Sequence, residues 1–138
     1  MAEEKIIKSN ERVKAHGEVF TPKNIVNQML NTFAIQPELQ KLSATFLEPA
    51  AGEGAFLTEI LLRKLKIASR VSNTIEAFEQ NSLIALTSLY GIELLVDNTE
   101  LLVIHMYQLF YQEYLRQLSI YNAPENKKVV KSAMTIVK

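Results

Sequence analysis

The residues best suited to chemistry lie in the run 46–57, where a short apolar stretch ends in an acid and leads into a glycine loop. Glu48 and Pro49 close the apolar stretch, and Gly52 and Gly54 precede apolar residues at helical spacing. Glycine lets a backbone approach a ligand closely, because it has no Cβ and tolerates positive φ. The free amides of a helix N-terminus favour an anionic group. This order of strand, acid, loop and helix predicts a nucleotide or cofactor pocket.

The loop differs from two common phosphate-binding motifs. Leu57 stands where the G-x-G-x-x-G dinucleotide motif has its third glycine, and the Lys-Ser/Thr pair of a P-loop is absent. The Glu48 carboxylate would repel a pyrophosphate, but it suits a ligand with a positive ammonium or sulfonium group. For an isolated G-x-G, a surface turn that uses glycine only for its shape remains the alternative.

A second acid, Glu93, ends another predicted strand at 88–93. A carboxylate at this position can accept both hydroxyls of a ribose. Glu93 follows Gly54 at more than the roughly 20 residues of the dinucleotide motif, so an extra helix must intervene. Because parallel strands end at the same edge of a sheet, we expect Glu48 and Glu93 to face one crevice. The alternative for Glu93 is a solvated acid at the end of a strand.

A third segment, Gly17-Glu18-Val19-Phe20-Thr21-Pro22, precedes a helix predicted over 22–34. Thr21 is expected to be its N-cap and Pro22 its first residue. With this segment the chain resembles the N6-adenine DNA methyltransferases of restriction–modification systems. Residues 17–22, 46–57 and 90–98 are similar to motifs X, I and II of that family, in the order of its γ-type members.

The resemblance implies S-adenosylmethionine as the cofactor. Its implied cofactor-binding residues are Phe20, Thr21, Glu48, Pro49, Ala50, Gly52, Gly54, Glu93 and Leu94. Glu48 would meet the methionyl ammonium, and Thr21 would donate to the methionyl carboxylate. Glu93 would accept the ribose hydroxyls, and Leu94 would pack against the adenine. Ordinary core packing is the alternative for Phe20 and Leu94, and a plain helix cap is the alternative for Thr21.

The predicted elements alternate along the chain. Strands are expected at 44–48, 88–93 and 132–137, helices at 54–66 and from 97 to about 121, and one helix or a helix pair between 75 and 86. This order predicts an α/β fold with a parallel sheet, and the resemblance implies a partial Rossmann-like class I methyltransferase fold. We expect an N-terminal helical segment over 1–34, in which 1–16 is a docking helix or a disordered tail. The first half of the cofactor-binding domain would follow over 35–138.

The composition excludes several kinds of site. With 15 basic and 15 acidic residues, the chain lacks the basic excess of an autonomous DNA-binding domain. It has no cysteine for a thiolate metal site, and two histidines are too few for an evident metal cluster. His105, on an apolar helix, is expected to be structural. Because the sequence shows neither a signal peptide nor an apolar run of about 20 residues, we expect a cytoplasmic location and no membrane contact.

The family's catalytic Asn/Asp-Pro-Pro-Tyr/Phe tetrapeptide has no counterpart here, since Asn122-Ala123-Pro124-Glu125 differs in composition and position. We therefore assign no catalytic residue. We expect the N-terminal cofactor-binding portion of a larger site-specific DNA adenine methyltransferase, inactive alone. The intact enzyme's partners would be DNA and a restriction or specificity subunit, and an incomplete sheet edge would favour homo-oligomers. The alternatives are a truncated, non-catalytic module that binds a cofactor or a subunit, and a nucleotide-dependent enzyme such as a dehydrogenase.

Overall fold

Two short parallel strands lie among helices in the computed structural model, which describes residues 4–138. Strand β1 spans Phe46–Glu48 and β2 spans Leu89–Gly91. They pair in parallel, with Phe46 opposite Leu89 and Glu48 opposite Gly91. The prediction of adjacent parallel strands ending near Glu48 and Glu93 is therefore confirmed. Both strands are shorter than the predicted spans 44–48 and 88–93.

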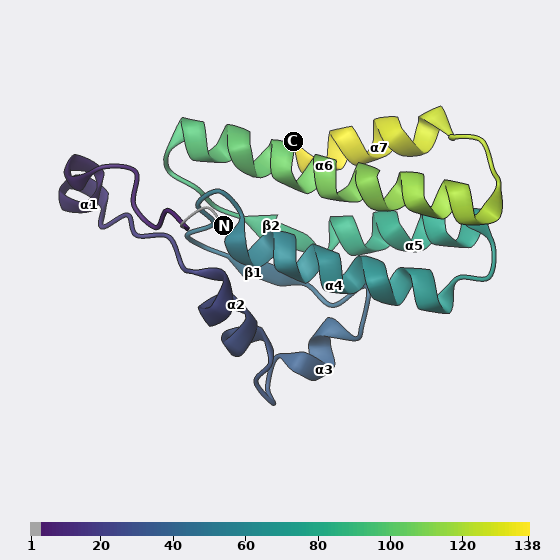
Figure 1. Cartoon of the computed structure of the whole chain (residues 1–138), viewed down its shortest axis with the longest axis horizontal. Coiled ribbons are helices and arrows are strands. Elements are labelled where there is room, and N and C mark those ends of the chain that lie inside the picture. The colour runs from purple at the N-terminus through teal and green to yellow at the C-terminus, as the bar shows by residue number, and fades with distance from the viewer. Residues whose placement is uncertain (1–3) are drawn as a thin grey trace.

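The rest of the fold is mostly helical (Figure 1). The helices are α1 (Asn10–His16), α2 (Lys23–Leu30), α3 (Gln36–Leu39), α4 (Ala55–Val71), α5 (Ile75–Thr87), α6 (Val96–Tyr121) and α7 (Lys127–Val137). Helix α4 contacts α5 and α6 on one side and α2 and α3 on the other, and α7 packs against α5 and α6. The interval 75–86, for which one helix or a helix pair was predicted, holds the single helix α5.

Local hydrogen bonds explain where several helices begin and end. The Thr74 hydroxyl accepts from the amide of Ala77 at 3.1 Å and starts α5. The Asn126 side chain accepts from the amide of Lys128 at 3.0 Å and starts α7. Asn122 adopts a left-handed conformation, with φ of 49°, and ends α6 as its C-cap. The predicted end of this long helix near residue 121 is therefore confirmed.

The predicted third strand at 132–137 is wrong, because these residues belong to α7. The segment ends in the β-branched residues Thr135, Ile136 and Val137, which favour a strand by composition. Its apolar positions, however, recur at helical spacing, and α7 buries Val129 and Ala133 against α5 and α6. Packing of this helical face therefore outweighs the local strand preference.

Two helix boundaries also differ from the prediction. Helix α2 ends at Leu30 rather than near residue 34, and Phe33 beyond it is fully exposed. Its N-cap is Pro22, so Thr21 does not cap the helix as predicted. Helix α4 continues to Val71 rather than residue 66, because Ile67 and Ala68 extend its buried face.

One face of the sheet is open. Gly91 lies against α4 and α6, where a Cβ on this residue would meet Leu57 and Leu102. On the opposite face, the paired residues Leu47 and Tyr90 are 62% and 55% exposed. Successive residues of a strand point to opposite faces, so helices cover one face of the sheet and leave the other uncovered.

A buried lysine secures the end of the sheet opposite the glycine loop. The Nζ atom of Lys64 in α4 donates to the carbonyls of Leu42 at 3.0 Å and Ala44 at 2.5 Å, just before β1. It also donates to the Ser88 hydroxyl at 2.6 Å, just before β2. Burial without a partner carboxylate lowers the pKa of Lys64 to about 8. The Lys64 amine therefore holds the segments that precede β1 and β2 against α4.

Candidate functional site

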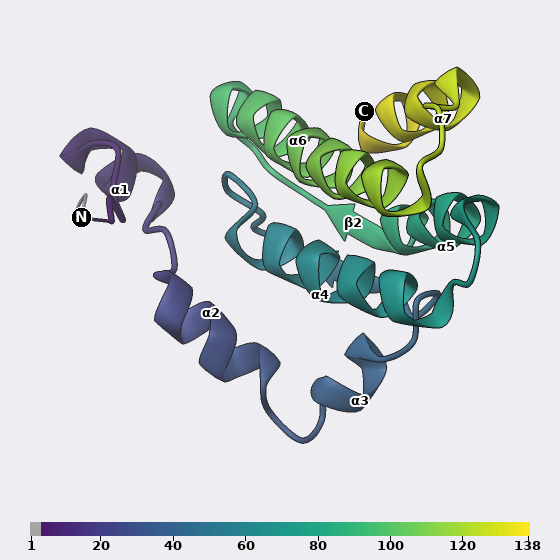
Figure 2. The same ribbon diagram turned by 45° about the vertical axis from the view of Figure 1, so that its right-hand side comes forward.

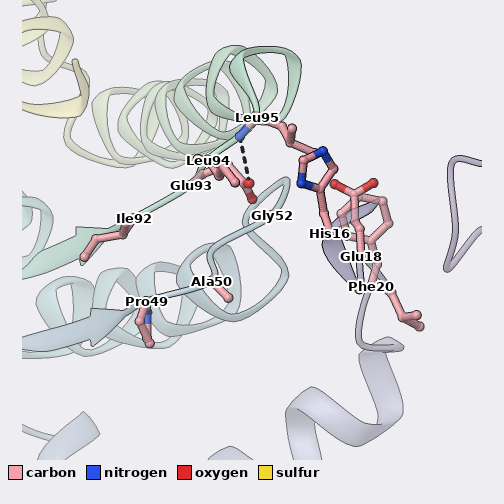
Figure 3. Close-up of a pocket in the computed structure, with 12 residues that line it drawn as sticks. His16, Glu18, Phe20, Pro49, Ala50, Gly52, Ile92, Glu93, Leu94 and Leu95 are labelled. Carbon is pink, nitrogen blue, oxygen red and sulfur yellow. Dashed lines mark hydrogen bonds between the residues drawn. The ribbon is translucent and has the colours of Figure 1, made fainter. Parts of the chain in front are cut away.

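Two adjoining cavities lie at the carboxyl ends of β1 and β2. The first, here called the Glu93 cavity, has a volume of about 220 Å³ and lies between residues 16–20 and residues 92–95 (Figure 3). The second, here called the Glu48 cavity, has a volume of about 450 Å³ and contains the start of α4. The Glu48 cavity alone is of the size of a small-molecule site, roughly 300–1,000 Å³. Val19, Phe20, Ala50 and Gly52 line both, so the cavities share a wall and a junction.

All nine predicted site residues line these cavities. Those in the Glu93 cavity are Phe20, Pro49, Ala50, Gly52, Glu93 and Leu94. Those in the Glu48 cavity are Phe20, Thr21, Glu48, Ala50, Gly52 and Gly54. Three segments that are far apart in the sequence therefore meet at one place in the fold.

The two strand-end acids have the same local geometry. One Glu93 carboxylate oxygen accepts from the amide of Leu95 at 3.1 Å, as Figure 3 shows. One Glu48 carboxylate oxygen accepts from the amide of Ala50 at 3.0 Å. Each acid is thus held by the amide two residues further along its own loop. Across residues 4–138, the second oxygen of each acid has no hydrogen-bond donor from the protein.

The two acids do not face a single crevice as expected. Glu93 lines the first cavity and Glu48 lines the second. The loop that follows β1 separates them, because Ala50 and Gly52 form part of both walls. A ligand that reached both acids would have to pass over this loop.

The glycines of the loop allow close approach by protein side chains. Gly52 has φ of 59°, and a Cβ there would lie 3.1 Å from the Phe20 ring and 4.0 Å from a Glu93 carboxylate oxygen. Gly54 has φ of 101°, and a Cβ there would lie 2.6 Å from the Leu102 side chain. Gly54 therefore serves the packing of α6 against the loop, whereas Gly52 holds open the junction of the cavities.

The start of α4 gives the Glu48 cavity an anion-favouring side. Gly54 is the N-cap, and no side chain in the part of the chain that the structure describes caps this end. Ala55 and Phe56, in the first turn, line the cavity together with Lys5 and Lys23. Uncapped amides at a helix N-terminus favour a negative group. Thr21 lies in the same wall, and because it does not cap α2 its hydroxyl is not used there.

The exposure of Leu94 excludes core packing, which was the alternative to a contact with adenine. Leu94 is 78% exposed beside the Glu93 cavity, so it is not a core residue. Phe20 is half-buried and contributes to both cavities, and the Lys8 ammonium lies 5.7 Å from the centre of its ring. A flat apolar ligand could therefore contact Leu94 without disturbing the core.

Several lining residues were not expected from the sequence. His16, Gly17 and Glu18 join the Glu93 cavity, and Lys5 and His105 join the Glu48 cavity. The His105 ring Nδ1 is 2.9 Å from the Glu53 carbonyl, a contact that fits the expected structural role. Gly17 and Glu18 belong to the segment 17–22 and His16 adjoins it, so these residues could have been included. Lys5 and His105 reach the site only through the tertiary fold, and no sequence pattern marks them.

Residues 4–138 contain no group of three or more acidic, histidine or cysteine side chains placed to hold a metal ion. Nor do they contain a helix whose length and apolar character would allow it to cross a membrane. The described site is therefore built from carboxylates, ammonium groups, backbone amides and apolar walls.

Comparison of the chain with protein-family models, curated proteins and solved structures finds no match. The resemblance to adenine methyltransferases therefore rests on its three motifs. The fold adds the observation that the residues of those motifs meet around two connected cavities.

Proposed function

We propose that this chain binds S-adenosylmethionine and forms the cofactor-binding portion of a DNA adenine-N6 methyltransferase of a restriction–modification system. One observation carries the proposal. Nine residues chosen from three separated motifs line two adjoining cavities at the carboxyl ends of parallel strands. This is the edge of an open α/β sheet at which ligands bind. We also propose that the two strands and their helices form part of a Rossmann-like fold.

The chemistry of the walls matches different parts of this cofactor. In the Glu93 cavity, the carboxylate oxygen not bonded to Leu95 is available to ribose hydroxyls, and the exposed Leu94 offers an apolar contact for adenine. In the Glu48 cavity, Glu48 suits the ammonium group of the methionyl part. The uncapped start of α4 suits its carboxylate, with Thr21 in the adjoining wall. Gly52 adds no side chain of its own beside the Phe20 ring at the junction, where the two parts of the cofactor would join.

The bound cofactor supplies an electrophilic methyl group, which the intact enzyme would transfer to adenine N6. This chain binds and orients the cofactor in that scheme. The sequence has no Asn/Asp-Pro-Pro-aromatic tetrapeptide to hold a flipped base. The groups that position the target amine would therefore come from elsewhere in the enzyme.

A second candidate function is a non-catalytic module that binds a subunit or another copy of the chain. The open sheet face favours this candidate, because Leu47, Tyr90 and Ile92 are all more than half exposed. Exposed apolar residues on a short, open sheet are typical of surfaces that pair with another chain. The open face adjoins the Glu93 cavity, because Ile92 belongs to both.

Calorimetric titration tests the proposal directly. We expect weak or moderate binding of S-adenosylmethionine and of its demethylated product, with little affinity for NAD or ATP. The Glu48 carboxylate disfavours a pyrophosphate, and the loop lacks a P-loop lysine. Tighter binding of NAD than of S-adenosylmethionine would instead favour a dehydrogenase. Light scattering on the same samples measures the oligomeric state that the second candidate predicts.

A further inference from the structure

The N-terminal arm, residues 4–20, carries α1 at its tip and stands apart from the main helical layers (Figure 2). Helix α1 buries none of its residues, so apolar packing does not hold it. The arm doubles back on itself, because the amide of Phe20 donates to the Ile6 carbonyl at 2.5 Å. Its position against the rest of the chain must therefore depend on other contacts.

Arg12 supplies the first of these contacts. Its guanidinium donates to both carboxylate oxygens of Asp97, at 2.7 Å and 3.1 Å, in the first turn of α6. The same guanidinium is 2.9 Å from one Glu18 oxygen and donates to the other at 3.0 Å. The paired contact with Asp97 is the strong form of a charged hydrogen bond. Arg12 thus joins α6 to a wall of the Glu93 cavity.

Lys8 supplies the second set of contacts. Its ammonium lies 2.9 Å from the carboxylates of both Glu53 and Asp97, and it also donates to the side-chain oxygen of Asn98. Asn98 is fully buried and donates in turn to Glu18 at 2.6 Å. Lys8 therefore connects the arm to the glycine loop as well as to α6.

The acids of this network adjoin the three walls of the site. Glu18 lies two residues before Phe20, and Glu53 lies between the two glycines of the loop. Asp97 follows the segment 92–95 that carries Glu93. The two cations of the arm thus hold together the three segments between which the cavities form.

We propose that the N-terminal arm is an ionic strap that closes the two cavities, and that its release admits and discharges the ligand. The part concerning the ligand rests on the proposed function. Release of Lys8 and Arg12 would leave Glu53 and Asp97, which lie outside the arm, without their cations. Repulsion between these two acids would then favour separation of the glycine loop from the start of α6.

The strap responds to salt rather than to moderate changes of pH. Hydrogen bonds from Arg12 and Lys8 hold the pKa of Asp97 well below its usual range, so this acid stays charged at neutral and mildly acidic pH. The Asp97 carboxylate, which both cations contact, is half exposed, and interactions of exposed charges weaken as the Debye length falls from about 10 Å at 0.1 M to about 3 Å at 1 M salt. Added salt should therefore loosen the arm while leaving the helical core intact.

Hydrogen exchange on the free chain tests the strap without any ligand. The Phe20 amide is the reporter, because it is bonded within the arm and its ring lines both cavities. We expect Arg12→Gln, or 1 M salt, to speed exchange at residues 17–21 about fivefold, with amides of α4 unchanged. The control Arg116→Gln removes an ion pair with Glu113 that is distant from the arm and should change neither. Equal exchange in wild type and Arg12→Gln would overturn the strap.

A double-mutant cycle shows whether Arg12 acts through Asp97. Arg12→Gln and Asp97→Asn should each accelerate exchange, and the double variant should add little to Arg12→Gln alone. Fully additive effects would overturn this assignment. With labelled S-adenosylmethionine, Arg12→Gln should also raise the dissociation rate about fivefold, and an unchanged rate would overturn gating. A chain that binds no cofactor but shows the exchange effects would refute the proposed function and leave the strap in place.

Discussion

Gly52 and the ring of Phe20 meet at the junction of the two cavities, so closely that a Cβ on Gly52 would lie 3.1 Å from the ring. The contact joins the glycine loop after β1 to the segment that precedes α2. It also leaves no room for a side chain between Phe20 and Glu93, since the same Cβ would be 4.0 Å from the Glu93 carboxylate. The shape of the junction therefore depends on the absence of a single methyl group.

The first prediction concerns this methyl group. We expect Gly52→Ala to weaken S-adenosylmethionine binding and to destabilise the fold, because the new Cβ displaces Phe20 and strains a backbone with φ of 59°. Gly17→Ala is the matched control for backbone strain in a residue that also lines the Glu93 cavity, since Gly17 has φ of 64° with no atom within 4 Å of its built Cβ. It should show only the backbone cost, roughly 1 kcal/mol in thermal or denaturant unfolding. Equal affinities for the two variants would contradict a role for Gly52 at the junction.

A second prediction concerns Glu93. We expect Glu93→Ala to weaken cofactor binding by roughly 1.5–3 kcal/mol, the contribution of hydrogen bonds to a charged acceptor. Stability should change little, because this strand-end acid is only half-buried and its one protein bond is to Leu95. Glu100→Ala removes an exposed acid of α6 and serves as the control for charge. Calorimetry that found a folded Glu93→Ala variant with unchanged affinity would leave Glu93 as a solvated strand end.

The third prediction uses the pH dependence of stability. The folded chain holds the pKa of Lys64 near 8, whereas the ordinary value is 10.5. Between these pH values the unfolded chain binds more protons, so the free energy of unfolding should rise with pH through this window. Each unit of pKa difference contributes about 1.4 kcal/mol.

Chemical denaturation from pH 7.5 to 10.5, roughly the interval between the two pKa values, measures this effect. The wild type should gain stability over Lys64→Met as the pH rises. Lys66→Met, which removes an exposed lysine of the same helix, should follow the wild type throughout. Parallel curves for wild type and Lys64→Met would show that the pKa of Lys64 is unchanged by folding.

A fourth prediction separates cofactor binding from methyl transfer. We expect this chain alone to transfer no methyl group to DNA, because it lacks the catalytic tetrapeptide. Binding to duplex DNA should be weak, since a net charge of +0 offers little neutralisation of phosphates. The measurement is tritium transfer from labelled S-adenosylmethionine to adenine-containing DNA. Activity of this chain alone would mean that the catalytic centre lies among residues assigned here to other roles.

Local sequence signals predicted the parallel strands and the walls of the site. The short apolar runs before Glu48 and Glu93 marked β1 and β2, and the glycine loop marked the start of α4. The strand predicted at 132–137 is wrong, because Val129 and Ala133 lie at helical spacing and are buried on one face of α7. The tertiary fold determines which elements pack against a segment. Here α7 packs against α5 and α6, and this packing favours a helix.

The contacts that close the site could not be predicted in this way. Arg12 and Asp97 are 85 positions apart, and Lys8 and Asp97 are 89 apart. Charged residues on solvent-facing helices have no periodic pattern that specifies a partner. The arm lies beside α6 only in the folded chain, so these ion pairs can be identified only from the structure.

The burial of Lys64 also makes it a chemical marker of unfolding. Acylating reagents modify lysines that solvent reaches, and Lys23, Lys41, Lys66 and the lysines of α7 are all exposed in the folded chain. The Lys64 amine is enclosed by Leu42, Ala44 and Ser88, so a reagent reaches it only when α4 separates from the strands. In a mass-spectrometric labelling time course, acylation at this one site would record opening of the core, whereas the other lysines would record only exposure to reagent.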